Sequence, residues 1–113
     1  MKTETKPLPF KGPLTGISDK TLMIHHDKLY AGYVAKKNEV QEKLAALEKG
    51  GDVASANQSY SELRALKDGE TFAVNGVYLH EWYFDVLGGD GTPTGPLVDA
   101  LMKDFGSLDN FVA

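Results

Sequence analysis

The chain has 113 residues, a formal net charge of −4 and no cysteine. This length corresponds to about one domain, and the balance of 42% hydrophobic and 25% charged residues is typical of a globular protein. The absence of cysteine excludes disulfides and zinc–thiolate sites, and it fits the cytoplasmic location that we expect. Since no basic run and no apolar stretch of about 18 residues occurs, we expect neither a nucleic-acid partner nor a membrane span.

An irregular arm occupies residues 1 to 17. Pro7, Pro9 and Pro13 fix φ and remove backbone donors, so no helix can run through them. Apolar residues recur between these prolines. We therefore expect the arm to lie extended against the body of the protein.

A long first helix is predicted from Ser18 to Gly50. Ser18 is a preferred N-cap, and Asp19 in the first turn has the charge that the helix dipole favours. A helix of about 30 residues exceeds the usual globular length, so we expect a bend or short break near Gly32. The apolar positions form one helical stripe: Leu22, Leu29, Tyr33, Val40, Leu44 and Leu47.

A second helical region is predicted from about Ala54 to Leu87, with a kink or short turn at Asp68-Gly69. Gly76, in the middle of this helix, costs about 1 kcal/mol relative to alanine. It leaves space beside His80 that a bulky group from elsewhere could fill. The apolar stripe before the kink runs through Val53, Ala56, Tyr60, Leu63 and Leu66; after the kink it resumes at Phe72, and Val77, His80, Phe84 and Leu87 share one face.

The predicted fold class is all-α. Two long helices joined near Gly50 should pack as an antiparallel hairpin, followed by short helices. We expect residues 1–89 to form the hairpin domain with its arm, and residues 90–113 to form a linker and the start of a C-terminal domain. Gly106 should close the first short helix, and Ser107 should cap the second. Because that last helix has no stop signal before Ala113, we expect the chain to be truncated.

Two histidines 55 positions apart are expected to meet. His25 lies near the start of the first helix and His80 near the end of the second. Antiparallel packing makes these two ends neighbours, so the two imidazoles can supply half of a metal site.

Four motifs, in order along nearly the whole chain, resemble the iron/manganese superoxide dismutase family. The first is Leu-Pro-Phe at residues 8–10, and the second is Ile-His-His-Asp-Lys at 24–28 followed by Tyr-Val at 33–34. The third is Asn-Gly-Val-Tyr-Leu-His at 75–80 with the aromatic residues after it. The fourth is Gly-Pro-Leu at 95–97 with Asp-Phe-Gly-Ser at 104–107.

This resemblance implies that His25 and His80 are ligands of a manganese or iron ion, and that Tyr33 stands at the substrate entrance as a catalytic residue. Family members carry out superoxide dismutation to oxygen and hydrogen peroxide, and the complete protein is expected to be a homo-oligomer. In iron-type members a glutamine precedes the second histidine by one turn. Gly76 occupies that position here, as in manganese-type members, which favours manganese slightly.

The remaining family ligands lie in an Asp-x-x-x-His stretch that this chain lacks, so we expect the chain alone to be inactive. The chain also departs from the family at three positions. Leu29 and Tyr30 stand where relatives usually have histidines, and Phe84 stands where a tryptophan is common. We expect His26 to be a neighbour of the site and not a ligand.

Two other functions remain open. The chain can be a metal-binding helical module without catalysis, completed by water or a neighbouring chain. It can also be a metal-free helical interaction module that keeps the fold and has lost the chemistry. Metal analysis with an activity assay separates these possibilities from a dismutase.

Overall fold

The computed structural model describes residues 2–50 and 53–113. Across these residues the regular secondary structure is helical, with a single isolated β-bridge between Leu14 and Ile17, and this confirms the all-α fold class. In this described part, no helix combines the length and the apolarity needed to cross a membrane. The elements are α1 (Asp19–Met23), the π-helix η1 (Ile24–Tyr30), α2 (Ala31–Gly50), the 3₁₀ turn η2 (Val53–Ser55), α3 (Glu62–Asp85), α4 (Pro96–Phe105) and α5 (Leu108–Val112).

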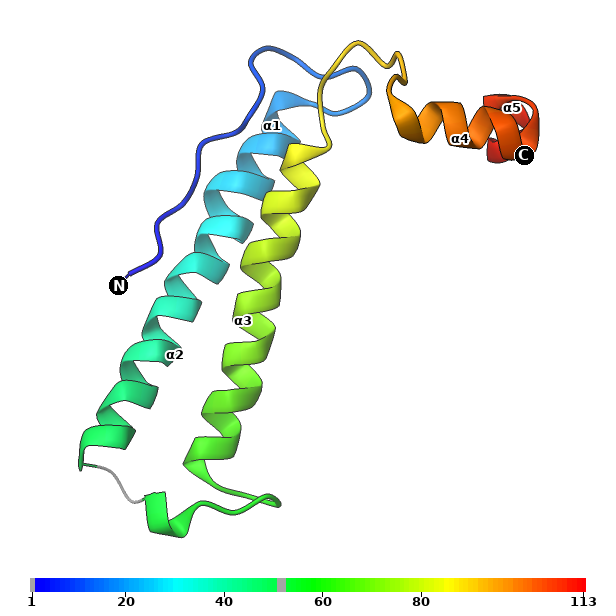
Figure 1. Ribbon diagram of the computed structural model, residues 1–113. Helices are drawn as coiled ribbons and strands as arrows, with labels where there is room; N and C mark the ends of the chain where they lie inside the picture. Colours follow the sequence, from blue (N-terminus) through cyan, green and yellow to red (C-terminus); the bar gives the residue numbers. More distant parts are fainter. Residues whose placement is uncertain (1, 51–52) are drawn as a thin grey trace.

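The body of the protein is an antiparallel hairpin of two long helices (Figure 1). The first is formed by α1, η1 and α2, which follow one another without a break, and the second is α3. As expected, the Ser18 side chain caps the first helix by accepting a hydrogen bond from the Thr21 N–H. The helix ends at Gly50, while Gly51 lies outside the described residues. Four buried side chains form a core between the helices: Tyr30, Val34, Val77 and Phe84. Three partly buried side chains pack against this core: Leu8, Tyr33 and Leu87.

The irregularity in the first helix lies before the expected position. Gly32 sits within regular α2, whereas residues 24–30 are π-helical, and the Ala31 N–H donates to the His26 carbonyl five residues back. In an α-helix, position 30 would lie about 140° around the axis from position 25. In a π-helix the backbone hydrogen bonds span five residues, so five residues make nearly one full turn. Positions 25 and 30 therefore come to lie on the same side of the helix.

This π-helical turn changes which side chains face the core. The predicted stripe counted Leu29 as buried, but Leu29 is 53% exposed and Tyr30 is 1% exposed. Beyond the π segment the inward positions continue through Val34 and Val40. The stripe was wrong at Leu29 because its spacing assumed one α-helical period throughout.

The second helical region is shorter at its start and straighter than predicted. It begins at Glu62, where the Ser61 side chain accepts a hydrogen bond from the Arg64 N–H, and it runs without a break through Gly69. A Cβ at Gly69 would lie 3.8 Å from the Val40 side chain, so the glycine faces α2 and does not end the helix. Tyr60 and Phe72, predicted as apolar stripe positions, are both exposed.

The N-terminal arm lies extended along the hairpin, as expected (Figure 1). The Thr3 N–H donates to the Asn38 side chain at 2.9 Å, and the Asn38 amide donates back to the Thr3 carbonyl at 2.8 Å. Farther along, Leu8 packs on the core and Phe10 contacts Gly88. These contacts hold the arm along the hairpin, from the middle part of the first long helix to the end that carries the histidines.

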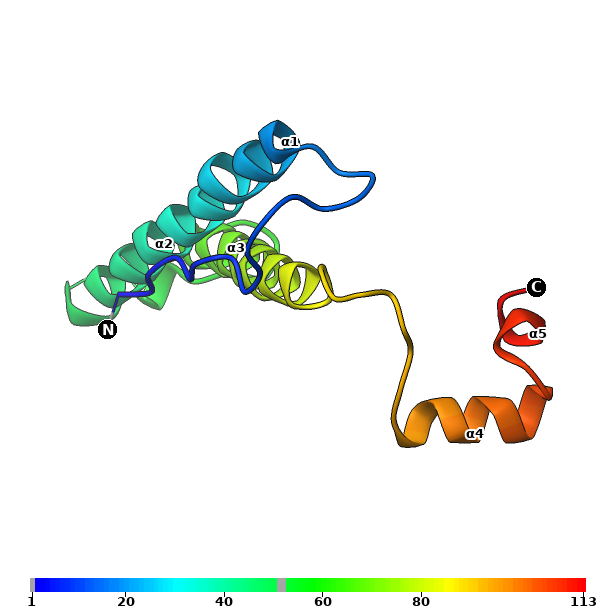
Figure 2. The ribbon, with the colours of Figure 1, turned by 90° about the horizontal axis from the view of Figure 1, so that it is seen from above.

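Helices α4 and α5 pack against each other and stand apart from the hairpin (Figure 2). Gly106 ends α4 in the left-handed conformation (φ 78°), and the Ser107 side chain caps α5 by accepting from the Asn110 N–H. Both features match the sequence-based expectation. Neither helix buries a residue within the described chain, and Phe105 contacts Phe111 edge-on.

We predict that Ser61→Ala lowers the free energy of unfolding by about 1 kcal/mol, because the first turn of α3 loses its side-chain cap. Urea unfolding followed by circular dichroism measures this change. Ser59→Ala is the matched control, since Ser59 is exposed and lies outside α3. Equal destabilisation by both substitutions would contradict the capping role.

Candidate metal centre

His25 and His80 come from the two opposite helices of the hairpin and meet at its open end. His25 lies in the π-helix η1 and His80 near the end of α3, and their ring centres are 4.9 Å apart. Tyr83 and Phe84 flank His25, with ring centres at 4.9 and 5.3 Å. The structure therefore brings together the two histidines that were predicted to meet, and aromatic side chains lie around them.

Both imidazoles are suited to bind a metal as neutral donors. His80 donates its Nδ1–H to the Gly76 carbonyl at 2.6 Å, which leaves the Nε2 lone pair for a ligand. Burial, and then the neighbouring His80, lower the pKa of His25 below its ordinary value. A lowered pKa favours the unprotonated ring, which is the form that binds a metal ion.

The spacing of the rings is compatible with one shared ion. Two imidazoles at roughly a right angle on one ion, with metal–nitrogen bonds of about 2.1 Å, have ring centres about 4.6 Å apart. The observed separation is 4.9 Å. Within residues 2–50 and 53–113, however, no cluster of three or more histidine, aspartate or glutamate side chains could hold an ion. The two histidines thus fit a metal as part of a ligand set.

Tyr33 lies directly beside His80, with ring centres 5.2 Å apart. Its ring occupies the space above Gly76, where an added Cβ would come within 2.6 Å of the Tyr33 Cγ atom. The bulky group predicted to fill the space at Gly76 is therefore Tyr33 from the other helix. The contact explains the mid-helix glycine, because any larger residue would push Tyr33 away from His80.

His26 has both ring nitrogens engaged by groups outside the His25–His80 pair. Nδ1 donates to the Asp27 carboxylate and Nε2 donates to the Lys6 carbonyl, each at 2.7 Å. Burial acts to lower the pKa of His26, but these hydrogen bonds outweigh it and raise the pKa above its ordinary value. With no free nitrogen, His26 is placed as a neighbour of the site.

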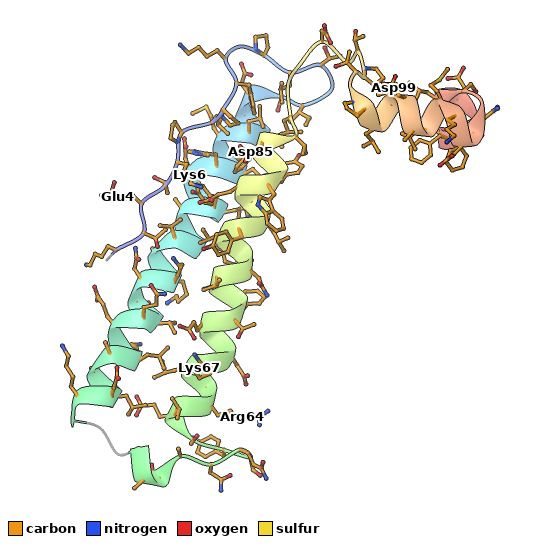
Figure 3. All side chains as sticks on the ribbon, in the orientation of Figure 1. Glu4, Lys6, Arg64, Lys67, Asp85 and Asp99 are labelled. Carbon is orange, nitrogen blue, oxygen red and sulfur yellow. The ribbon has the colours of Figure 1, made fainter. Side chains whose placement is uncertain are left out.

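Sequence reasoning missed a polar network behind the histidines. Glutamate is rarely buried unless it is paired, yet Glu81 is only 9% exposed. Its carboxylate accepts from the Tyr30 hydroxyl at 2.9 Å and from the Lys6 ammonium at 2.5 Å. The sequence did contain a signal of this network, because Glu81 is a charged residue on the same helix face as Val77 and Phe84. Figure 3 places Lys6 on the arm, at the histidine-bearing end of the hairpin.

We predict that Gly76→Ala lowers the free energy of unfolding by about 1–3 kcal/mol, although alanine is the better helix former. The added Cβ overlaps the Tyr33 ring, which must move. Urea unfolding measures the change. Gly32→Ala is the matched control, because Gly32 is helical and has open space around its missing Cβ, so it should be stabilising. A stabilising Gly76→Ala would contradict the close packing.

We also predict that, in the metal-free chain, His25 titrates below pH 6.5 and His26 above it, as measured by NMR. For His25, the contribution to stability is complete above pH 6.5 and is lost as the pH falls through its lowered pKa. For His26, the contribution is complete below pH 6.5 and is lost as the pH rises through its raised pKa. Removal of one histidine at a time assigns the resonances, and a reversed order would refute the assignment.

Comparison with known proteins identifies the family. Residues 8–88 match the family model described as iron/manganese superoxide dismutases, alpha-hairpin domain. The chain is 49% identical over 98 residues to proteins named superoxide dismutase [Fe] from Aquifex aeolicus and Aquifex pyrophilus, which covers 85% of this chain and 46% of each relative. It is 39% identical over 114 residues to superoxide dismutase [Fe] from Cupriavidus metallidurans, which covers 100% of this chain and 55% of the relative.

A relative from Branchiostoma floridae, named superoxide dismutase [Mn], mitochondrial, is 34% identical over 97 residues. The relatives thus include proteins named for iron and proteins named for manganese. The chain spans about half the length of the curated relatives it matches. The matched region contains the hairpin with both histidines and Tyr33, and the chain belongs to the iron/manganese superoxide dismutase family.

Proposed function

We propose that this chain forms half of the metal site of a superoxide dismutase, with His25 and His80 as two of the ligands. The observation that carries the proposal is the meeting of these two rings, 4.9 Å apart, from residues 55 positions apart in the chain. Iron or manganese is the expected ion, since imidazole suits both and the relatives are named for one or the other.

The bound metal would supply the one-electron oxidation and reduction that dismutation requires. The chain's own contribution is to hold two neutral imidazoles and to control what reaches them. The hydrogen bond from His80 to the Gly76 carbonyl fixes the tautomer and the orientation of that ring. Phe84 and Tyr83 exclude water from the sides of His25.

Tyr33 is the proposed catalytic residue at the entrance to the site. It borders a shallow pocket of about 300 Å³ that Lys28, Lys36 and Phe72 also line. The whole chain carries a charge of −4, which opposes the approach of a small anion. Lys36 is paired with the Glu39 carboxylate, which offsets its charge. Lys28, for which no ion pair is found among the described residues, is the lysine that can give this entrance a local positive charge and so favour superoxide there. The tyrosine hydroxyl is a donor that can serve a bound anion.

Two imidazoles alone leave a redox site incomplete, so the remaining ligands must come from outside these residues. We propose that residues 1–89 form the hairpin domain and that residues 90–113 begin the domain that supplies them. A homo-oligomer in the cytoplasm is part of the same proposal, supported by the family and by a sequence without cysteine. Gly76, which leaves no glutamine one turn before His80, favours manganese over iron.

The test compares the chain alone with the chain fused to the second half of the Aquifex pyrophilus relative. We predict dismutase activity and about one bound metal per molecule in the fusion, and no activity in the chain alone. His25→Ala or His80→Ala should abolish both properties of the fusion, because each removes a ligand. Tyr33→Phe should retain the metal and lower the rate.

His26→Ala is the matched control, because it removes the third histidine without removing a proposed ligand, and it should retain the metal. A fusion that binds metal through His25 and His80 without turnover would favour the non-catalytic metal module. Metal content that is unchanged by His25→Ala and His80→Ala would overturn the ligand assignment and favour the metal-free module.

A further inference from the structure

One residue of the N-terminal arm uses all of its polar groups on the hairpin. The Lys6 N–H donates to the Tyr30 hydroxyl at 3.0 Å, and the Lys6 carbonyl accepts from the His26 ring at 2.7 Å. Its ammonium group contacts the Glu81 carboxylate at 2.5 Å. Lys6 therefore bonds to both long helices at once, since Tyr30 and His26 belong to η1 and Glu81 belongs to α3.

Each of these three partners adjoins one of the paired histidines. His26 follows His25 in the chain, and Glu81 follows His80. The Tyr30 ring lies nearly parallel to the His80 ring, at 22° and with centres 6.2 Å apart. Lys6 thus bonds to the side chains of the residues that follow both proposed ligands in the chain, and to the tyrosine whose ring lies against His80.

The hydrogen-bond network around Lys6 is buried where it meets the hairpin, so its members depend on one another as partners. Tyr30 is 1% exposed and Glu81 is 9% exposed, whereas the Lys6 side chain is 70% exposed. A buried carboxylate requires partners, and only the Tyr30 hydroxyl and the Lys6 ammonium are found for it among the described residues. Tyr30 cannot rotate away without leaving one carboxylate oxygen of Glu81, Oε1, and the Lys6 N–H without these hydrogen bonds.

We propose that Lys6 is a positioning residue for the His25–His80 pair: it ties the arm to both helices and, through Tyr30 and Glu81, fixes where the His80 ring lies. The proposal rests on the proposed function, because the position of the pair matters for a metal site. Lys6 does not touch the metal or the substrate. It acts through residues in contact with His80.

The test uses Lys6→Met in the 113-residue chain, which keeps the apolar stem and the backbone bonds and removes only the ammonium group. Lys2→Met is the matched control, because Lys2 is also on the arm and pairs with an exposed glutamate, Glu42, at 2.9 Å. Two readouts are taken by NMR at a temperature where each variant is folded. The first is the ring resonances of His80 and Tyr30 without metal, and the second is their broadening by added Mn²⁺.

We predict that Lys6→Met shifts the His80 and Tyr30 ring resonances and weakens Mn²⁺ binding about tenfold, as loss of a supporting residue typically does. Lys2→Met should change neither readout, and Lys6→Arg should restore both toward the original chain. Tyr30→Phe, which keeps the ring and removes the hydroxyl, should act in the same direction as Lys6→Met.

Unchanged ring resonances and Mn²⁺ affinity in Lys6→Met, with only a loss of stability, would show that Lys6 merely anchors the arm and would overturn the proposal. If Mn²⁺ broadens neither histidine in the original chain, two imidazoles without the remaining ligands do not hold the ion, and the fusion decides the ligand assignment. The metal-free resonances then still decide whether Lys6 positions the pair, because a shift in His80 and Tyr30 supports it and its absence refutes it.

Discussion

The packing of Phe84 between the two long helices is the contact on which the candidate site depends. Its buried ring lies 5.3 Å from His25, 5.9 Å from Tyr30 and 6.2 Å from His80, measured between ring centres. A large aromatic side chain at this point sets the distance between the helices, because interiors are close-packed and tolerate few voids. The two histidines meet because this spacing leaves room for one imidazole beside the other.

The π-helical turn supplies the second condition. An α-helical turn through residues 24–30 would separate His25 from Tyr30 around the helix axis, whereas the five-residue hydrogen bond from Ala31 to His26 returns both to the inner side. Irregular turns of this kind are found frequently at functional sites. Here the turn allows one helix to present His25, a proposed metal ligand, and the buried Tyr30 to the same partner helix.

The site combines apolar packing with a small number of fully satisfied polar groups. No buried side-chain nitrogen or oxygen in the described part of the chain lacks a hydrogen-bond partner. Glu81 is the clearest case, because a buried carboxylate without partners costs several kcal/mol, and it receives hydrogen bonds from Tyr30 and Lys6. Tyr30 has a structural role here, because its phenol reaches Glu81 and its ring fills the core next to His80.

Local patterns in the sequence determined the ends of several helices and the pairing of the histidines. Ser18 and Ser107 cap helices by side-chain hydrogen bonds that depend on neighbouring residues alone. An antiparallel hairpin places the helix end that carries His25 beside the helix end that carries His80. Only the tertiary structure decided that α3 runs straight through Gly69, that Tyr30 is buried in place of Leu29, and that Lys6 reaches Glu81. These features arise from close contact between segments far apart in the chain, and no periodicity within one segment encodes the energy of that contact.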